Sequence, residues 1–218
     1  MKLDEILEAF DTQVSDKTTS RSFRPSVPPK SEDELGRGSF SIARPSKDPH
    51  TIKKRQFNDP SLRKESDVFQ DYARVVYKNK LWDKIHFPRI YSAKTLKDKE
   101  GNVLHRWEME KLLPLDSLAK NDHDELYHFF AKYVPEDYAL SVRSFLDVLD
   151  QAAHTGNVDK IDDENLQRAI KWLHQMYRHF AKKYDKMRFD LRPSNVMVRR
   201  TNTGPQLVFS DPFWSPKK

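Results

Sequence analysis

The chain has 218 residues, enough for one medium domain or for two small lobes that share a cleft. Hydrophobic residues make up 37% of it and charged residues 33%, so it can bury a core beneath a heavily solvated surface. The net charge of +6 favours acidic partners such as phosphate groups, RNA or an acidic protein, although a solvated basic surface alone would give the same charge. The absence of cysteine excludes disulfides, thiolate zinc sites and cysteine nucleophiles.

The sequence predicts no membrane association. No stretch is long and apolar enough to span a membrane, and the residues after Met1 lack the apolar core of a signal peptide. We therefore expect a cytoplasmic protein with no membrane partner. Helical spacing of apolar residues predicts an amphipathic helix over 1–15, and the stretch 16–34, rich in Ser, Thr, Lys and Pro, predicts a flexible linker.

Turn signals and strand-like segments dominate the sequence from residue 35 to about residue 112 and return near the C-terminal end. Glycine-containing turns separate apolar segments of strand length, which is typical of β-hairpins. Two hairpins are predicted in this way: Ile90–Leu96 with Val103–Met109 around Gly101, and Asn195–Val198 with Gln206–Ser210 around Gly204.

Helical periodicity appears once within the strand-rich half and then throughout the second half. The first stripe runs from Glu65 to Val76, and the longest runs from Leu166 to Phe180, with Asp162 or Asp163 as its N-cap. The layout predicts an α+β fold in two parts, a small antiparallel sheet with one helix followed by a mainly helical part.

The segment after the longest predicted helix carries the chemistry. It reads Arg-Phe-Asp-Leu-Arg-Pro-Ser-Asn over 188–195, and the second hairpin then ends at Asp211. Because Asp, Pro, Ser and Asn all favour turns, an ordinary turn is the alternative interpretation. Phosphoryl transfer needs an aspartate that orients the attacking hydroxyl, oxygen ligands for magnesium and positive charge near the phosphate. Asp190 suits the first role, Asn195 and Asp211 the second, and Arg192 the third.

This segment resembles the protein-kinase superfamily, whose catalytic loop reads His-Arg-Asp-Leu-Lys-Pro-x-Asn and is followed by Asp-Phe-Gly. The resemblance covers roughly residues 35–214. It implies a two-lobed kinase-like fold, with an N-lobe over 35–112, a truncated and mainly helical C-lobe over 113–218, and ATP and Mg²⁺ as cofactors. The residues it implies are Asp190 and Arg192 for catalysis, and Asn195 and Asp211 for the metal.

The strand-rich half contains further segments that resemble kinase nucleotide-binding elements. Gly36, Gly38 and Ser39 resemble a glycine-rich loop, in which backbone N–H groups approach phosphates closely. Lys53 is our candidate for the lysine that contacts the α- and β-phosphates. The adjacent Lys54 is its rival, because strand alternation lets only one of the two face the nucleotide; in the alternative interpretation both are solvated.

The kinase lysine pairs with a glutamate on the helix that follows, and Glu65 is the candidate because it shares the apolar stripe of that helix. A carboxylate at a helix N-terminus can equally be a partner of the helix dipole. Asp67 and Asp71 are expected mostly off that stripe. In the resemblance, Met109 would lie behind the adenine, and the backbone from Glu110 to Leu112 would bind the adenine edge.

Three features depart from the kinase pattern. Arg188 and Phe189 replace the usual His-Arg, and Pro212 follows the metal aspartate where the backbone is normally freer. The sequence ends shortly after Asp211, so we expect a C-lobe that lacks the activation segment and the later helices. Substrate binding is then expected to use the helices between 122 and 155, the N-terminal arm or a partner.

Within the superfamily, the sequence is similar to the early serine/threonine protein kinases of short-tailed coliphages. The similarity lies in Phe189 before Asp190 and in Asp211-Pro212 followed by Trp214-Ser215. It implies phosphorylation of bacterial host proteins in the host cytoplasm. Two alternatives are a pseudokinase-like protein that binds and inhibits a host protein, and a small-molecule phosphotransferase. Nucleic acid is not expected as the primary partner, because Lys and Arg are dispersed along the sequence.

Overall fold

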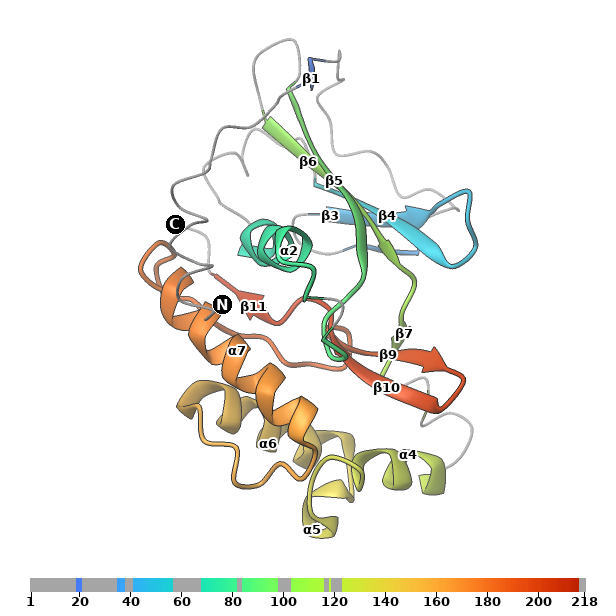
Figure 1. The fold of residues 1–218 in the computed structure, drawn as a ribbon, viewed down its shortest axis with the longest axis vertical. Coiled ribbons are helices and arrows are strands. Elements are labelled where there is room, and N and C mark those ends of the chain that lie inside the picture. The colour runs from blue at the N-terminus through green and yellow to red at the C-terminus, as the bar shows by residue number, and fades with distance from the viewer. Residues whose placement is uncertain are drawn as a thin grey trace.

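A computed structural model describes residues 19–20, 35–37, 41–56, 68–81, 84–97, 103–115, 118 and 123–215. A six-stranded sheet with one helix forms one part, and helices with two small sheets form the other (Figure 1). The predicted α+β class, with an antiparallel sheet first and mainly helices second, is therefore confirmed. None of the helices in the described ranges has the length and apolar character needed to cross a membrane.

The larger sheet has the strand order β1-β5-β6-β4-β3-β2, and all of its pairs are antiparallel except β1 with β5. The predicted hairpin around Gly101 is confirmed by the pairing of β5 with β6. Within the stretch predicted as a linker, Thr19 and Ser20 pair with Leu96 and Lys97 as a short parallel strand. The strands are β1 (Thr19–Ser20), β2 (Gly36–Arg37), β3 (Ser41–Pro45), β4 (Thr51–Gln56), β5 (Ile90–Lys97) and β6 (Val103–Glu110).

Helix α2 (Val68–Lys78) lies against this sheet and buries the apolar stripe that predicts it. Phe69 packs edge-on against Trp107 of β6, with ring centroids 6.1 Å apart. The expectation that Asp71 lies off the inner face is wrong, because Asp71 is buried. Its carboxylate accepts hydrogen bonds from Lys183 Nζ and from Tyr184 Oη at 2.8 Å, and these bonds offset the cost of burying it.

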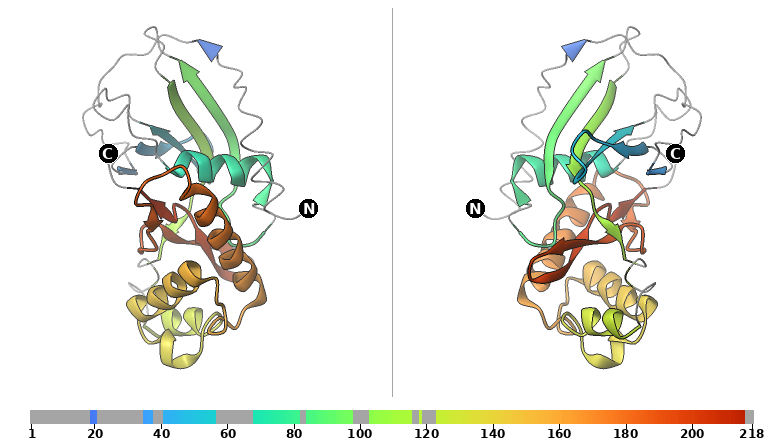
Figure 2. Two further views of the ribbon diagram at one scale, coloured as in Figure 1. Left: turned by 90° about the vertical axis from the view of Figure 1, so that its left-hand side faces the viewer. Right: turned by 90° about the vertical axis from the view of Figure 1, so that its right-hand side faces the viewer.

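The second part combines helices with short strands (Figure 2). The predicted hairpin around Gly204 is confirmed, and Gly204 has φ +108°, a conformation that side chains disfavour. Asp163 caps the longest helix by accepting a hydrogen bond from Leu166 N at 2.7 Å. The elements are β7 (Leu113–Pro114), α4 (His123–Phe130), α5 (Glu136–Ala139), α6 (Val142–Thr155), α7 (Glu164–Phe180), β8 (Arg188–Phe189), β9 (Val196–Thr201), β10 (Gly204–Phe209) and β11 (Phe213–Trp214).

One cluster of buried side chains extends through both parts. The ring of Tyr72 on α2 lies 5.7 Å from the ring of Phe213 on β11, and that ring lies 5.8 Å from Phe180 at the end of α7. Strand β7 continues this connection, because it follows the large sheet along the chain and pairs with β9. Continuous packing of this kind holds charged residues from the two parts in a fixed relation.

Candidate active site

Two very short strands place the two predicted aspartates side by side. Strand β8 ends just before Asp190, and β11 begins two residues after Asp211. The strands pair with Phe189 opposite Phe213, and Asp190 N donates a hydrogen bond to Pro212 O at 2.9 Å. A site assembled from distant segments thus rests on backbone hydrogen bonds and on a buried aromatic pair.

The loop from Asp190 to Asn195 closes on itself. Asn195 N and Val196 N donate to Arg192 O at 2.8 and 2.9 Å, which forms a tight turn. The side-chain amide Asn195 Nδ2 donates back to Asp190 O at 2.9 Å and to Asp190 Oδ2 at 2.8 Å. Asn195 therefore fixes the orientation of the predicted catalytic carboxylate.

Asn195 also connects this loop to the metal-ligand candidate Asp211. The carbonyl of Asn195 accepts hydrogen bonds from Ser210 N at 2.8 Å and from Asp211 N at 3.4 Å. The structure therefore brings together the catalytic and metal-binding candidates of the sequence.

Arg192 lies at the solvent-exposed side of the cluster. Its Nη2 donates to Asp190 Oδ2 at 2.7 Å, and its side chain is 62% exposed. The hydrogen bonds from Arg192 and Asn195 both reach Oδ2 of Asp190, so within the described part of the chain Oδ1 has no protein donor. The carboxylate is held through one oxygen and offers the other.

The lysine in contact with this cluster is Lys54 rather than Lys53. Lys54 Nζ donates to Asp211 Oδ2 at 2.8 Å and lies 3.3 Å from the centre of the Phe69 ring. Lys54 pairs with Trp107 across β4 and β6, whereas Lys53 pairs with Glu108. Because successive side chains of a strand point to opposite faces, our first candidate, Lys53, is directed away from Asp211.

Tyr72 supports the strand that ends at Asp211, and sequence reasoning did not identify it as a site residue. Its hydroxyl donates to the carbonyl of Phe209, the last residue of β10. Burial raises the pKa of Tyr72 well above its usual value, and the negative charge of Asp211 raises it further. The helical stripe predicted burial of Tyr72 but gave no signal of its partner.

The other predicted nucleotide contacts are placed only in part. Gly36 pairs with Ala43 in the β2–β3 hairpin, whereas Gly38, Ser39 and Glu65 lie outside the described residues. Met109 and Leu112 are buried.

The backbone of the predicted adenine-binding segment is partly engaged within the protein. Glu110 N donates to Arg89 O at 2.9 Å, and Lys111 N donates to His50 O at 2.8 Å. Two N–H groups of the segment predicted to bind the adenine edge are therefore already hydrogen-bonded within the protein.

Glu110 has a second and unpredicted role through its side chain. Both carboxylate oxygens accept from Arg199 of β9, Oε1 from Nη2 at 2.5 Å and Oε2 from Nε at 2.8 Å. Arg199 also donates to Ile85 O at 2.8 Å, Phe87 O at 2.8 Å and Gln206 Oε1 at 2.6 Å. All five guanidinium hydrogens thus have acceptors, and the buried pair joins the end of the large sheet to the β9–β10 hairpin.

The oxygen donors present suit a magnesium ion shared with phosphates. No group of three or more His, Asp or Glu side chains gathers as a metal site in the parts of the chain that the structure describes. Asn195 and Asp211 would supply an amide and a carboxylate oxygen, and Mg²⁺ commonly takes only one or two protein ligands beside water and substrate phosphates. This pair therefore fits a metal that binds together with a nucleotide.

No family model matches the sequence, and no curated protein matches it. Two solved structures are similar to the chain over 96% of its length and 72% of theirs, at 16% identity. One is the GDP and kanamycin complex of APH(2″)-IIIa, with a TM-score of 0.33. The other is the GDP complex of wild-type aminoglycoside 2′-phosphotransferase-IIIa, with a TM-score of 0.34. Similarity at this level assigns neither an activity nor a substrate to this chain.

Proposed function

We propose that this protein is an ATP- and magnesium-dependent phosphotransferase that acts on serine or threonine hydroxyls of proteins. The observation that carries the proposal is the joined cluster in which Asn195 orients the Asp190 carboxylate and Lys54 bonds Asp211. These residues come from two distant parts of the chain, and an ordinary turn at 190–195 would not require a cationic partner from β4. The arrangement contains the groups that phosphoryl transfer needs.

Each residue has a defined task in this reaction. Asp190 Oδ1 accepts the hydrogen bond of the substrate hydroxyl, because Oδ2 is already occupied by Arg192 and Asn195. The substrate oxygen bonds to the γ-phosphorus as the bond to the β,γ-bridging oxygen breaks, and the hydroxyl proton passes to Asp190. Arg192 and Lys54 place positive charge beside the phosphates. Asn195 and Asp211 would hold magnesium, which neutralises phosphate charge when it is bound.

The charge of the chain favours a protein substrate over a cationic small molecule. The net charge is +6, and the exposed guanidinium of Arg192 lies directly beside the proposed base. Cationic substrates would be repelled at this position, whereas hydroxyls on neutral or acidic protein segments would not. We extend the proposal to bacterial host proteins, on the sequence similarity to the early kinases of short-tailed coliphages. Phe189, one of the residues in that similarity, packs against the ring of Phe213 beside Asp190.

The test uses γ-labelled ATP, magnesium and a bacterial lysate as the source of acceptor proteins. The wild-type chain is expected to transfer label to serine or threonine, identified by phosphoamino-acid analysis. Asp190→Asn keeps the size of the side chain and should lower transfer about 10²- to 10⁴-fold. Asp159→Asn is the matched control, because Asp159 lies in an exposed turn after α6, and it should transfer like the wild type.

The outcomes separate the proposal from its alternatives. Equal transfer by Asp190→Asn and wild type would contradict the assigned base. Label on a small-molecule acceptor but on no protein would contradict the substrate class. Absence of transfer, together with no rise in melting temperature on adding ATP and magnesium, would favour a protein that only binds a partner.

A further inference from the structure

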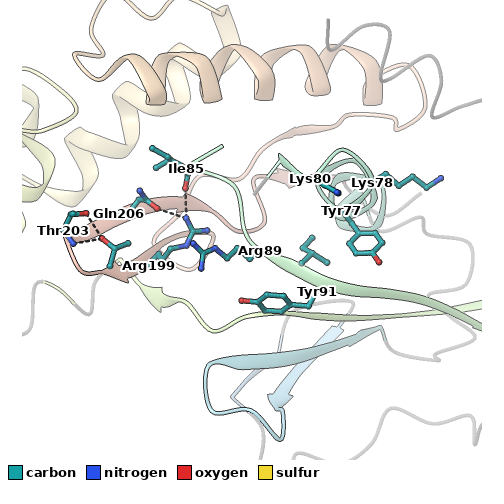
Figure 3. Close-up of a pocket in the computed structure, with 11 residues that line it drawn as sticks. Tyr77, Lys78, Lys80, Ile85, Arg89, Tyr91, Arg199, Thr203 and Gln206 are labelled. Atoms are coloured by element: carbon teal, nitrogen blue, oxygen red, sulfur yellow. Dashed lines mark hydrogen bonds between the residues drawn. The ribbon is translucent and has the colours of Figure 1, made fainter. Parts of the chain in front are cut away.

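A second site lies away from the Asp190 cluster. A cavity of about 940 Å³ opens between the end of α2, the start of β5 and the β9–β10 hairpin. Figure 3 shows Arg89 between the hairpin and α2, beside Arg199, with Tyr91 on β5. None of the residues that we assign to phosphotransfer lines this cavity.

Among the described residues, four cationic side chains and no carboxylate line the cavity. The chain as a whole has 39 Lys and Arg against 33 Asp and Glu, so a lining of one sign is a local feature rather than a reflection of composition. Arg199 is offset by the buried carboxylate of Glu110 behind the wall. Lys80 and Arg89 therefore give the cavity a positive potential, which a negatively charged ligand would complement.

Apolar surface is exposed in the same cavity. Ile85 is 38% exposed and Tyr91 is 50% exposed, and they are two of the four large apolar residues that are exposed among the described residues. A free phosphate or a polyphosphate would leave this surface in water. A ligand that carries both carboxylates and apolar side chains would cover it.

The adjoining edge of β5 offers main-chain hydrogen-bonding groups. Among the described residues, the outer edge of β5 is paired only at Leu96 and Lys97, where β1 lies. From Ile90 to Thr95 the described chain supplies a partner only on the inner side, which is β6. An open strand edge beside a pocket is the geometry by which an extended peptide adds to a sheet.

We propose that this cavity and the open edge of β5 bind an extended acidic segment of a partner protein. The segment pairs with β5 through its backbone. Its acidic side chains reach Lys80 and Arg89, and the alternate apolar side chains cover Tyr91 and Ile85. The binding requires no nucleotide, so its failure would leave the phosphotransfer proposal unaffected, and the reverse also holds.

The test measures fluorescence anisotropy of a labelled hexapeptide that alternates glutamate and valine, mixed with the full chain at low salt. Three comparison ligands separate the contributions of charge and of backbone hydrogen bonds to binding. They are the same peptide with glutamine for glutamate, the same peptide with N-methylated backbone amides, and a hexauridylate. The first comparison removes charge, the second removes strand donors, and the third presents a polyanion with bases.

Two double variants localise the binding. Lys80→Asn with Arg89→Gln removes two charges from the cavity; asparagine tolerates the positive φ of +50° at residue 80. Lys171→Gln with Lys182→Gln removes two exposed charges from α7 and the segment after it, and serves as the matched control. Circular dichroism melting checks that both variants fold.

We expect the cavity variant to raise the Kd of the acidic peptide about tenfold and the control variant to leave it unchanged. Removal of the carboxylates or N-methylation should weaken binding by a similar factor. An equal loss in the control variant would overturn the proposal, because it would indicate a general attraction to a basic protein. No measurable binding of the acidic peptide, tighter binding of hexauridylate, or full affinity of the N-methylated peptide would overturn it as well.

Discussion

Two carboxylate–guanidinium pairs of this molecule are chemically alike and differ in their surroundings. The Glu110–Arg199 pair is buried, with side chains 7% and 8% exposed, and all five donor hydrogens of its arginine are satisfied within the protein. The Asp190–Arg192 pair is open to solvent on the arginine side, where the side chain is 62% exposed. The arginine of the buried pair therefore has no donor left for a ligand, whereas the Asp190–Arg192 pair can still bind one.

This difference separates a structural ion pair from a site. Removing a charge from a buried, saturated network leaves the partner charge desolvated and unpaired, which costs folding free energy. Removing a charge from an exposed pair costs little stability, because water replaces the partner. We therefore expect mutations at Glu110 to act on folding, and mutations in the Asp190–Arg192 pair to act on chemistry.

The largest effect on stability is expected for Glu110→Ala. The change leaves the buried Arg199 guanidinium without its carboxylate and should lower the free energy of unfolding by about 3–5 kcal/mol. Arg192→Ala is the comparison at the exposed pair and should change it by less than about 1 kcal/mol. Urea unfolding followed by circular dichroism measures both. Similar losses in the two variants would contradict the distinction between the pairs.

The next effect concerns the reaction and separates two neighbouring lysines. Lys54→Met removes the cation that bonds Asp211 and should lower phosphate transfer about 10²-fold. Lys53→Met, on the opposite face of β4, should transfer at a rate close to that of the wild type. Initial rates at saturating ATP and magnesium measure the difference. A larger loss in Lys53→Met would assign the phosphate-contacting role to Lys53.

Sequence reasoning predicted those parts of the site that depend on local spacing. The loop from Asp190 to Asn195 closes within six residues, and the turn preferences of its residues act at that range. The hairpin that returns the chain to Asp211 follows from strand alternation on both sides of Gly204. These features need no knowledge of tertiary contacts, and they placed the catalytic and metal-binding candidates together.

The features that sequence reasoning missed depend on contacts between distant segments. The alternation of side chains along the strand indicated that only one of Lys53 and Lys54 can be the phosphate-contacting lysine. Only the packing of β4 against Phe69 decides which of them faces Asp211. The burial of Asp71 could not be predicted, because it depends on Lys183 and Tyr184, which follow it by more than a hundred residues along the chain. A carboxylate is inexpensive to bury only when its partners are supplied by the fold.

A smaller effect should come from Tyr72, whose buried hydroxyl supports the strand that ends at Asp211. Tyr72→Phe removes the hydroxyl that bonds Phe209 O and leaves that buried carbonyl without this donor. We expect a loss of about 1–2 kcal/mol in the free energy of unfolding, because an unsatisfied buried acceptor is costly. Phosphate transfer by the folded variant should change by less than the loss in Lys54→Met. A rate loss as large as that of Lys54→Met, without a change in stability, would instead place Tyr72 in the chemistry.

The smallest effect is a pH dependence at the buried His86, which joins the segment before β5 to the second part of the molecule. One ring nitrogen, Nδ1, lies 2.9 Å from Leu207 O, and the other, Nε2, lies 3.6 Å from Asp163 Oδ1. Burial lowers the pKa of His86 below its ordinary 6.5, although the Leu207 hydrogen bond and Asp163 oppose the change. Below pH 6.5 the unfolded chain therefore binds a proton that the folded chain does not, so stability falls as the pH falls towards the folded pKa. The slope should reach at most about 1.4 kcal/mol per pH unit for this group. Urea unfolding between pH 5 and pH 8 should show a shallower slope in His86→Gln than in the wild type, with the exposed His50→Gln as the control for loss of a histidine. Identical slopes in His86→Gln and the wild type would show that His86 binds its proton equally in both states.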